Sequence, residues 1–425
     1  MREEFLQYIW ANALFRCSDF VSCSGKKIQI LNVGTWNRDA GPDFFNARLR
    51  IENIEFAGNI EIHLKNSDWY RHGHHVDAAY NNVLLSVVKE ADGNIYNSAG
   101  QEVETVVLEY AENLYEEYLF MQRAVHQPGC RQNLKMIDKE WFDMTLEALA
   151  IERLERKCGD IRNILEQTQD DWQECFYRLL CKYWAGNVNS DPFYQLALRL
   201  PYKVLLKHSD KPEQQEALLL GCAGLLEEET GNDEYVNSLR DEFHYLQSKY
   251  GLTVLSAEQW KFMRIRPDAF PTVRIALLAS FFREFPDLVG KVTEAQNLWE
   301  IFDALEVKAS SYWDTHYRFG QTSFVHPKKM GQSLKNIVVI NVVVPFLFLY
   351  GKYQANEKYC DRAMGWLEQL SAEKNYIITD WENCGFHFNS ALQTQALIQL
   401  RKEYCDKHRC LQCKLGREVL KKMSI

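Results

Sequence analysis

Near residue 115 the spacing of apolar side chains changes from every second residue to every third or fourth, and this change restricts the fold more than any other feature. Before it, apolar and polar residues alternate, as they do in strands with one buried face. The alternating stretches are 26–34, 43–51 and 54–64, and a further pair of short strands is predicted within 93–110. The run NVLLSVVKE at 82–90 is almost continuously apolar, which is typical of a central strand. We therefore predict a mixed sheet, preceded by an amphipathic helix at the start of the chain.

After this point the periodicity is helical. In WFDMTLEALAIERLERKC, Phe142, Leu146 and Leu149 recur at spacings of four and three, as on one face of a helix. Pro271 stands at the first position of another such segment, where proline is favoured. The predicted fold class is α+β, with an α/β domain built on a mixed sheet at residues 1–115. Residues 116–425 are predicted to form a large all-α domain that ends in a cysteine cluster.

Charge and hydropathy limit the class of protein. The chain is 46% apolar and 13% aromatic, as in a folded globular protein. Its 49 basic and 58 acidic residues give a net charge of −9, which argues against a dedicated nucleic-acid binder but allows a local basic groove. The longest apolar run, 337–350, is shorter than the roughly 20 residues that cross a bilayer, and Asn341 and Pro345 interrupt it. The first residues lack the pattern of a signal peptide, so we predict a soluble cytoplasmic protein with no membrane partner.

The stretch GNIEIHLKNSDWYRHGHH, residues 58–75, holds the densest concentration of chemically useful side chains. Alternate residues of a strand share a face, so Glu61, His63 and Lys65 are predicted to lie together. Asp43 begins the preceding strand, and a hairpin would bring it near Glu61. Two such carboxylates bind Mg²⁺ or Mn²⁺, and His63 or Lys65 beside them would activate water for phosphodiester hydrolysis. The alternative interpretation is a structural hairpin with a polar open face.

Three further histidines follow within the same stretch. His72, His74 and His75 are accompanied by Asp68 and Asp77, and these are ligand types for zinc, manganese or iron. They would complete a metal site, contact a substrate phosphate, or serve a metal hydrolase of small substrates. In the alternative interpretation they belong to a solvated loop and cap backbone groups.

The spacing of these acids resembles the PD-(D/E)xK nuclease superfamily. Pro42 and Asp43 supply the PD, and 18 residues after Asp43 come Glu61, Ile62 and His63. The predicted order of one helix and three strands also fits that core. The usual lysine is replaced by His63, with Lys65 two residues further on, which implies either a migrated lysine or a degenerate site.

The resemblance implies a metal-dependent, nuclease-like phosphodiesterase in which Asp43 and Glu61 bind the metal and nucleic acid is the partner. The alternative is a catalytically inactive nuclease-like protein that serves as a binding or scaffold module.

The chain as a whole also resembles an uncharacterised bacterial family, catalogued as domain of unknown function 2851. This likeness is carried along the chain by the segments GPDFFNA, GNIEIHL, SDWYRHGHH, YNNVLLSVV, RIRPDAFPTVR, INVVVPFLFLYG and CLQC. It implies a bacterial origin and a common fold, and it implies no activity.

The C-terminal region contains a second candidate metal site. Cys410 and Cys413 have the two-residue separation of metal ligands, and Cys405 lies just before them. Cys384 or His408 would supply a fourth ligand. Four soft ligands suit structural zinc or an iron–sulfur cluster, and the alternative is a set of unliganded thiols at a helix end.

Two arginines form the weakest candidate site. Arg264 and Arg266 precede the helix predicted to begin at Pro271, where arginines can hold a substrate phosphate. The alternative is that they pair with acidic neighbours. The sequence contains no glycine-rich phosphate loop, GxSxG or HExxH motif.

Overall fold

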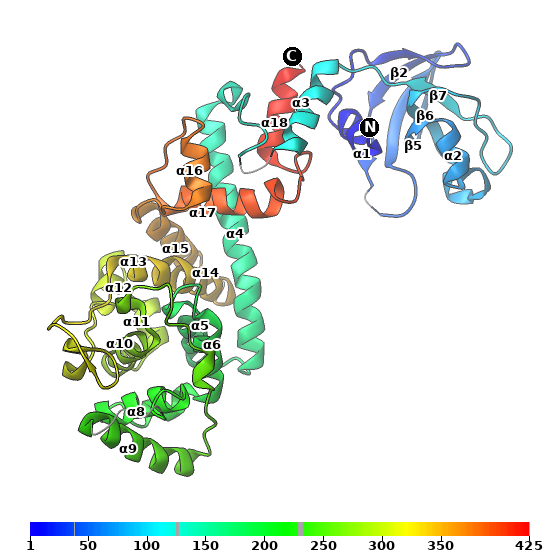
Figure 1. Ribbon diagram of the computed structural model, residues 1–425. Coiled ribbons are helices and arrows are strands. Elements are labelled where there is room, and N and C mark those ends of the chain that lie inside the picture. Colours follow the sequence, from blue (N-terminus) through cyan, green and yellow to red (C-terminus); the bar gives the residue numbers. More distant parts are fainter. Residues whose placement is uncertain (38, 125–126, 228–232, 425) are drawn as a thin grey trace. The chain divides into compact units, whose positions relative to one another are not determined.

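The computed structural model describes residues 1–37, 39–124, 127–227 and 233–424 (Figure 1). The chain divides into two compact units. Unit 1 comprises Met1–Thr145, Tyr376–Phe386 and Ile398–Ile425, and unit 2 comprises Leu146–Asn375 and His387–Leu397. The change from strand to helix lies just before the predicted boundary at residue 115, because the last strand of the large sheet, β7 (Glu104–Val107), is followed by α3 (Glu112–Arg123).

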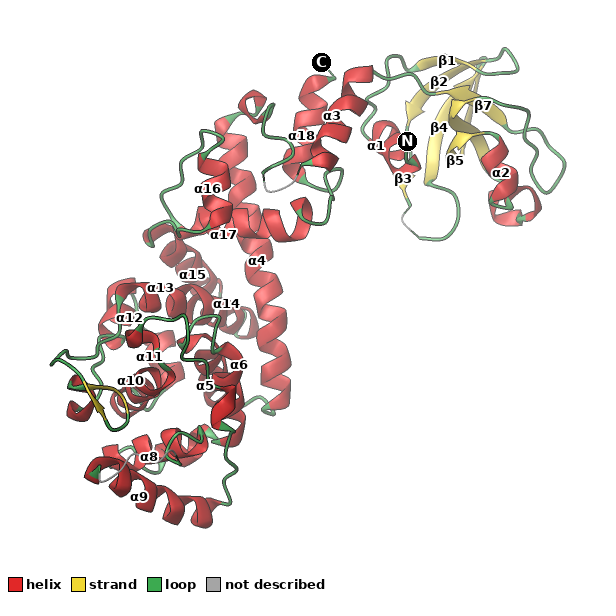
Figure 2. Ribbon diagram, in the orientation of Figure 1, coloured by secondary structure: helices red, strands yellow, loops and turns green. Residues whose placement is uncertain are grey.

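Unit 1 is built on a seven-stranded mixed sheet (Figure 2). Besides β7, its strands are β1 (Asp19–Val21), β2 (Lys27–Asn32), β3 (Thr35–Trp36), β4 (Phe44–Ile51), β5 (Ile54–Lys65) and β6 (Val83–Glu90). The order is β1-β2-β4-β5-β6-β7, and β3 also pairs with β4. The pairs from β1 to β5 are antiparallel, whereas β5, β6 and β7 run parallel. The predicted α+β class and mixed sheet are confirmed.

Helix α1 (Glu3–Ala11) lies against β5, and short helical segments connect β5 to β6. The connection begins with α2 (Ser67–Arg71) and continues through two 3-10 turns. Trp69 and Tyr80 from this connection join Val83 and two neighbours in a buried apolar cluster. Of the two strands predicted within 93–110, the second is present as β7. In place of the first, Tyr96 forms a single β-bridge with Glu102.

The C-terminal helix belongs to the same unit as the sheet because it packs on the first and third helices. Helix α18 (Lys414–Met423) lies beside α3. The Tyr8 hydroxyl in α1 donates a hydrogen bond of 3.1 Å to the carbonyl oxygen of Arg417. Phe5 stacks on Tyr118 of α3 with ring centroids 5.1 Å apart. Segments from the two ends of the sequence therefore share one core.

Unit 2 is almost entirely helical. Its helices are α5 (Trp172–Trp184), α6 (Ser190–Arg199), α7 (Tyr202–Leu206), α8 (Pro212–Cys222), α9 (Glu234–Tyr250), α10 (Pro271–Glu284), α11 (Leu288–Glu294), α12 (Leu298–Ala304), α13 (Gln332–Val338), α14 (Val344–Tyr353) and α15 (Glu357–Gln369). Two helices, α4 (Lys139–Gln167) and α17 (Ala391–Leu400), have residues in both units, whereas α16 (Tyr376–Glu382) belongs to unit 1. Unit 2 also contains one pair of short strands, β8 (His316–Arg318) and β9 (Gln321–Thr322). Pro271 begins α10, as predicted, because its fixed φ suits a first helical position.

Among the residues that the structure describes, one helical segment, Gln332–Tyr353, is long and apolar enough to cross a membrane by length and composition. The most apolar stretch of 18 residues in this segment is 78% buried inside the protein. Its π-helical turn, Val339–Val343, is tied to the core by Lys157, whose ammonium donates to the carbonyl oxygen of Ile340 at 3.1 Å and to Asn341 Oδ1 at 3.0 Å. The segment is therefore a core helix of the kind found in soluble proteins, as the interrupted apolar run predicts.

Candidate metal centre

Strand pairing brings the two predicted acids together at one end of β4. Phe44 pairs with Ile60 of β5, so Asp43, just before β4, lies next to Glu61. The backbone N–H of Asp43 donates to Glu61 Oε2 at 3.0 Å, and the N–H of Ile62 donates to Asp43 Oδ2 at 2.9 Å. Each carboxylate is thus held by the backbone of the other strand, with Asp43 oriented further by Gln7 Nε2 at 2.8 Å.

Three histidines converge beside this pair. His63 follows Glu61 on the same face of β5, and His72 and His74 come from the turn after α2. One ligand nitrogen from each of the three lies within 4.8 Å of the others. Gly73 between His72 and His74 has a φ of +80°, which L residues adopt at a cost. This left-handed turn lets both neighbouring imidazoles reach β5.

Glu61 connects the acids to the histidines. Its Oε1 lies 3.2 Å from His74 Nε2 and 3.6 Å from His63 Nε2. His63 is 1% exposed and His74 is 8% exposed, whereas His72 is exposed and gives the cluster access to solvent. Apart from these ion-pair contacts with Glu61, both ring nitrogens of His63 and Nε2 of His74 are buried without a hydrogen-bond partner. Such groups are costly in a folded protein, and a bound cation would satisfy them.

A family model described as "Protein of unknown function (DUF2851)" matches residues 3–376. The chain belongs to the DUF2851 family. This confirms the family resemblance stated from the sequence, while the nuclease resemblance stays a prediction. Searches of curated proteins and of solved structures each found no match. The matched range covers the whole sheet and the histidine cluster of this DUF2851 chain and ends before its C-terminal cysteines.

Burial sets the protonation states of the cluster. It raises the pKa of Glu61 from its usual 4.5 to about 8, and it raises that of Asp43 to about 7 with a further contribution from the charge of Glu61. Burial, together with His74 and His72, lowers the pKa of His63 to about 3. His63 is therefore a neutral imidazole near pH 7, which is the form that binds metals. The acids lack a compensating positive charge, and a divalent cation would supply it.

A third acid, Glu3 in α1, was not anticipated from the sequence. Burial raises its pKa, and the charge of His72 opposes that rise, so the two side chains are electrostatic neighbours. Its Oε1 is buried without a hydrogen-bond partner. Glu3 and Gln7 are one helical turn apart on α1, and this polar pair was the only local signal that the helix would face a polar site.

The remaining predicted residues are not among the converging side chains of this cluster. Lys65 pairs with Glu90 at 3.0 Å on the surface, so its ammonium is engaged outside the cluster. His75 packs against the ring of Tyr70, with centroids 5.1 Å apart, and is not one of the three converging histidines. Arg264 and Arg266 are exposed residues of unit 2.

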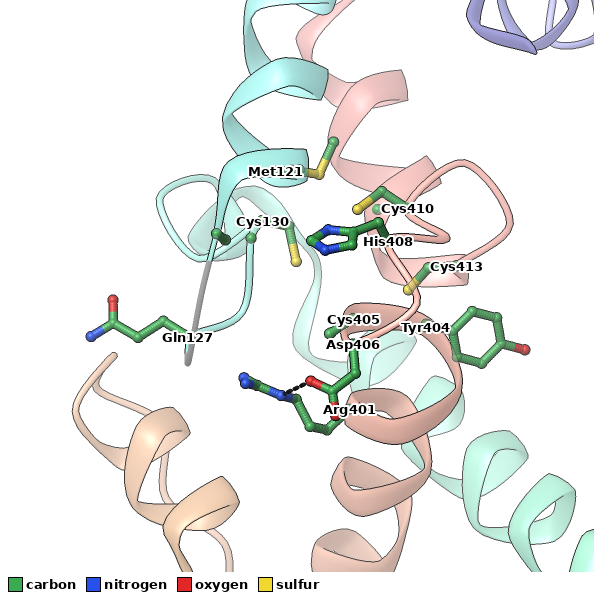
Figure 3. Close-up of a pocket in the computed structure, with 13 residues that line it drawn as sticks. Met121, Gln127, Cys130, Arg401, Tyr404, Cys405, Asp406, His408, Cys410 and Cys413 are labelled. Atoms are coloured by element: carbon green, nitrogen blue, oxygen red, sulfur yellow. Dashed lines mark hydrogen bonds and ion pairs between the residues drawn. The ribbon is translucent and has the colours of Figure 1, made fainter.

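The C-terminal cysteines are brought together with a partner that sequence spacing does not indicate. Cys405, Cys410 and Cys413 line one cavity in unit 1, and the fourth cysteine of that cavity is Cys130 (Figure 3). Cys384, predicted as a fourth ligand, does not line the cavity, and its thiol donates to the carbonyl oxygen of Asp380 at 3.2 Å. His408, the other predicted fourth ligand, does line it.

Metal removal is expected to make the stability of unit 1 depend on pH. The folded pKa values of Asp43 and Glu61 exceed their usual values of 3.8 and 4.5, so the folded state holds protons that the unfolded chain has released. Below about pH 6.5 the lowered pKa of His63 acts in the opposite direction, so the free energy of unfolding should fall most clearly as pH rises from about 6.5 to about 8. Urea unfolding of chelated protein at a series of pH values measures this slope. Glu61→Gln should reduce the slope of the free energy of unfolding against pH, and added Mn²⁺ should oppose this slope. Equal slopes for wild type and variant would contradict the raised pKa of Glu61.

Proposed function

We propose that this protein is a metal-dependent phosphodiesterase, a nuclease-like hydrolase of nucleic acid, with His63, His72, His74 and Glu61 as its metal ligands. The convergence of three imidazole nitrogens within 4.8 Å, beside a buried carboxylate, is the observation that carries the proposal. Imidazole nitrogens suit Mn²⁺, Zn²⁺ or iron, whereas Mg²⁺ prefers oxygen ligands. Mn²⁺ is therefore the favoured ion of the two that the acid pair suggested.

The connectivity of unit 1 supports the nuclease-like part of the proposal. A helix, α1, is followed by the antiparallel strands β2, β4 and β5. Asp43 stands at the start of the middle strand, and Glu61 and His63 lie on the third. The resemblance to PD-(D/E)xK nucleases implies this placement of the two acids.

A divalent cation at this place would stabilise the charge that develops on a phosphodiester and would lower the pKa of a water molecule. The protein's own residues perform the rest. Glu61 is fixed through Oε2 by the Asp43 N–H, which leaves Oε1 directed at the histidines. Asp43, held by the Ile62 N–H and by Gln7, lies beside Glu61, where its carboxylate could accept a proton from water. Exposed His72 marks the side from which a phosphate would approach.

One observation favours the alternative, a nuclease-like binding module without catalysis. The nucleases of this superfamily usually carry a lysine two residues after the acid, but His63 stands there, and Lys65 is engaged by Glu90. A phosphate-binding cation is thus absent from the usual position. If the protein is a hydrolase, its activity therefore depends entirely on the metal ion and the histidines. A cytoplasmic location is part of the same proposal.

The function is tested with full-length protein stripped of metal and reloaded separately with Mn²⁺, Zn²⁺ or Mg²⁺. Equilibrium dialysis should show tight binding of Mn²⁺ or Zn²⁺. The reloaded protein should then cleave single- or double-stranded DNA or RNA, or a small phosphodiester, with no cleavage in chelator. Metal binding without cleavage of any substrate would favour the binding module, and failure to bind metal would overturn both the centre and the hydrolase.

A further inference from the structure

Four cysteines of unit 1 surround a single cavity of about 270 Å³. Cys130 lies in the loop that follows α3, and the other three lie in the C-terminal segment before and at the start of α18. Figure 3 shows Cys130 on one side of the cavity and Cys410 and Cys413 on the other. None of the twelve cysteines of the chain is paired in a disulfide.

The spacing of three of these cysteines matches one known way of holding a metal cluster, although the fourth cysteine here precedes the other three. Cys405, Cys410 and Cys413 are separated by four and by two residues, and Cys130 is remote in sequence. The same spacing, C-x4-C-x2-C with a distant fourth cysteine, holds the iron–sulfur cluster of plant-type ferredoxins. Cys405 ends a π-helical turn, Arg401–Cys405, and such turns are frequent at functional sites.

The size of the cavity distinguishes a cluster from a single ion. One water-sized sphere needs about 10–15 Å³, so a cavity of about 270 Å³ is many times larger than one ion requires. In a tetrahedral zinc site the sulfur atoms lie about 3.8 Å apart, because each Zn–S bond is about 2.3 Å. Among the described residues, the group whose ligand atoms all lie within 4.8 Å is the histidine triad, not these thiols. The thiols therefore spread around a space for several atoms.

Close backbone contacts fix each wall of the cavity, and one hydrogen bond joins the two walls. A Cβ on Gly416 would lie 2.5 Å from the carbonyl oxygen of Cys410, and a Cβ on Gly129 would lie 2.5 Å from that of Met121. Both positions thus accept only glycine without a shift of the backbone. Gln122 Nε2 on α3 donates to the carbonyl oxygen of His408 at 2.9 Å and joins one wall to the other.

We propose that Cys130, Cys405, Cys410 and Cys413 bind an iron–sulfur cluster that fastens the C-terminal segment to α3. Each thiol releases its proton and coordinates iron as a thiolate. The role is structural, because cross-linking segments so far apart in sequence restricts the unfolded chain. It is independent of the hydrolase proposal, since none of these residues belongs to the histidine centre.

The test compares Cys130→Ser with Cys384→Ser in the full-length protein, purified without oxygen and reconstituted with ferric iron, sulfide and a thiol reductant. Wild type and Cys384→Ser should contain iron and acid-labile sulfide and show broad visible absorption. Cys130→Ser should lose both, although its helix content by circular dichroism is retained. Cys384 is the matched control because it lies in the same unit outside the cavity.

Three results would overturn the cluster: zinc bound in place of iron, wild type without iron or sulfide after reconstitution, or loss caused by Cys384→Ser and not by Cys130→Ser. If Cys130→Ser fails to fold, Cys410→Ser on the opposite wall provides the second variant. Iron that remains at the wild-type level in a folded Cys410→Ser would also contradict the proposal.

Discussion

Replacement of Glu61 by glutamine is expected to lower the rate of metal-dependent phosphodiester cleavage by about 10²–10⁴-fold. The glutamine side chain has the same shape and can still accept the hydrogen bond from the Asp43 N–H. It removes the negative charge beside His63 and His74, on which binding of the cation depends. The measurement is the initial rate of cleavage at saturating Mn²⁺, with thermal unfolding as the check that the fold persists.

Lys65→Met is the matched control for this substitution. The two residues lie four apart on β5, but Lys65 is half-exposed and its ammonium pairs with Glu90 rather than with the cluster. Removing a surface ion pair costs only about 0–1 kcal/mol, so the variant should fold and cleave as wild type does. An inactive Lys65→Met variant beside an active Glu61→Gln variant would reverse the assignment and restore the lysine as the catalytic group.

His72→Ala is expected to weaken Mn²⁺ or Zn²⁺ binding by about 100-fold or more. Loss of a residue that merely supports a ligand typically costs 10–100-fold, and loss of a ligand itself should cost at least as much. His72 is the best of the three histidines to change, because it is exposed and its removal leaves no cavity in the core. The affinity is measured by titration of stripped protein with each metal.

His75→Ala is the control, since His75 lies in the same turn but outside the group of converging nitrogens. Its metal affinity should stay within a few-fold of wild type. Equal weakening by the two substitutions would mean that the turn matters for its conformation and not for the ligand it presents. Unchanged affinity in His72→Ala would leave only His63 and His74 as nitrogen ligands.

Local pattern was sufficient to predict strands β2, β4, β5 and β6 and one part of the site. Alternation at 43–51 and 54–64 placed two strands next to one another, and strand pairing then brings Asp43 to Glu61. The same alternation correctly put His63 beside Glu61. It failed for Lys65, because β5 reaches the surface there and the long side chain follows the charge of Glu90.

Long-range packing decided the rest. Which of the three neighbouring histidines reaches β5 depends on the left-handed turn at Gly73, and such a turn leaves no periodic signal in the sequence. Cys130 joins Cys405, Cys410 and Cys413 only because α3 and α18 pack together.

The amino-acid sequence by itself thus determined the α+β class and the neighbouring acids, because residues a few positions apart obey the periods of strand and helix. The tertiary structure alone decided which histidines converge, how Glu3 approaches the site and which cysteine completes the tetrad. Those contacts join residues from different elements, and their formation is set by burial of apolar surface and not by any local repeat.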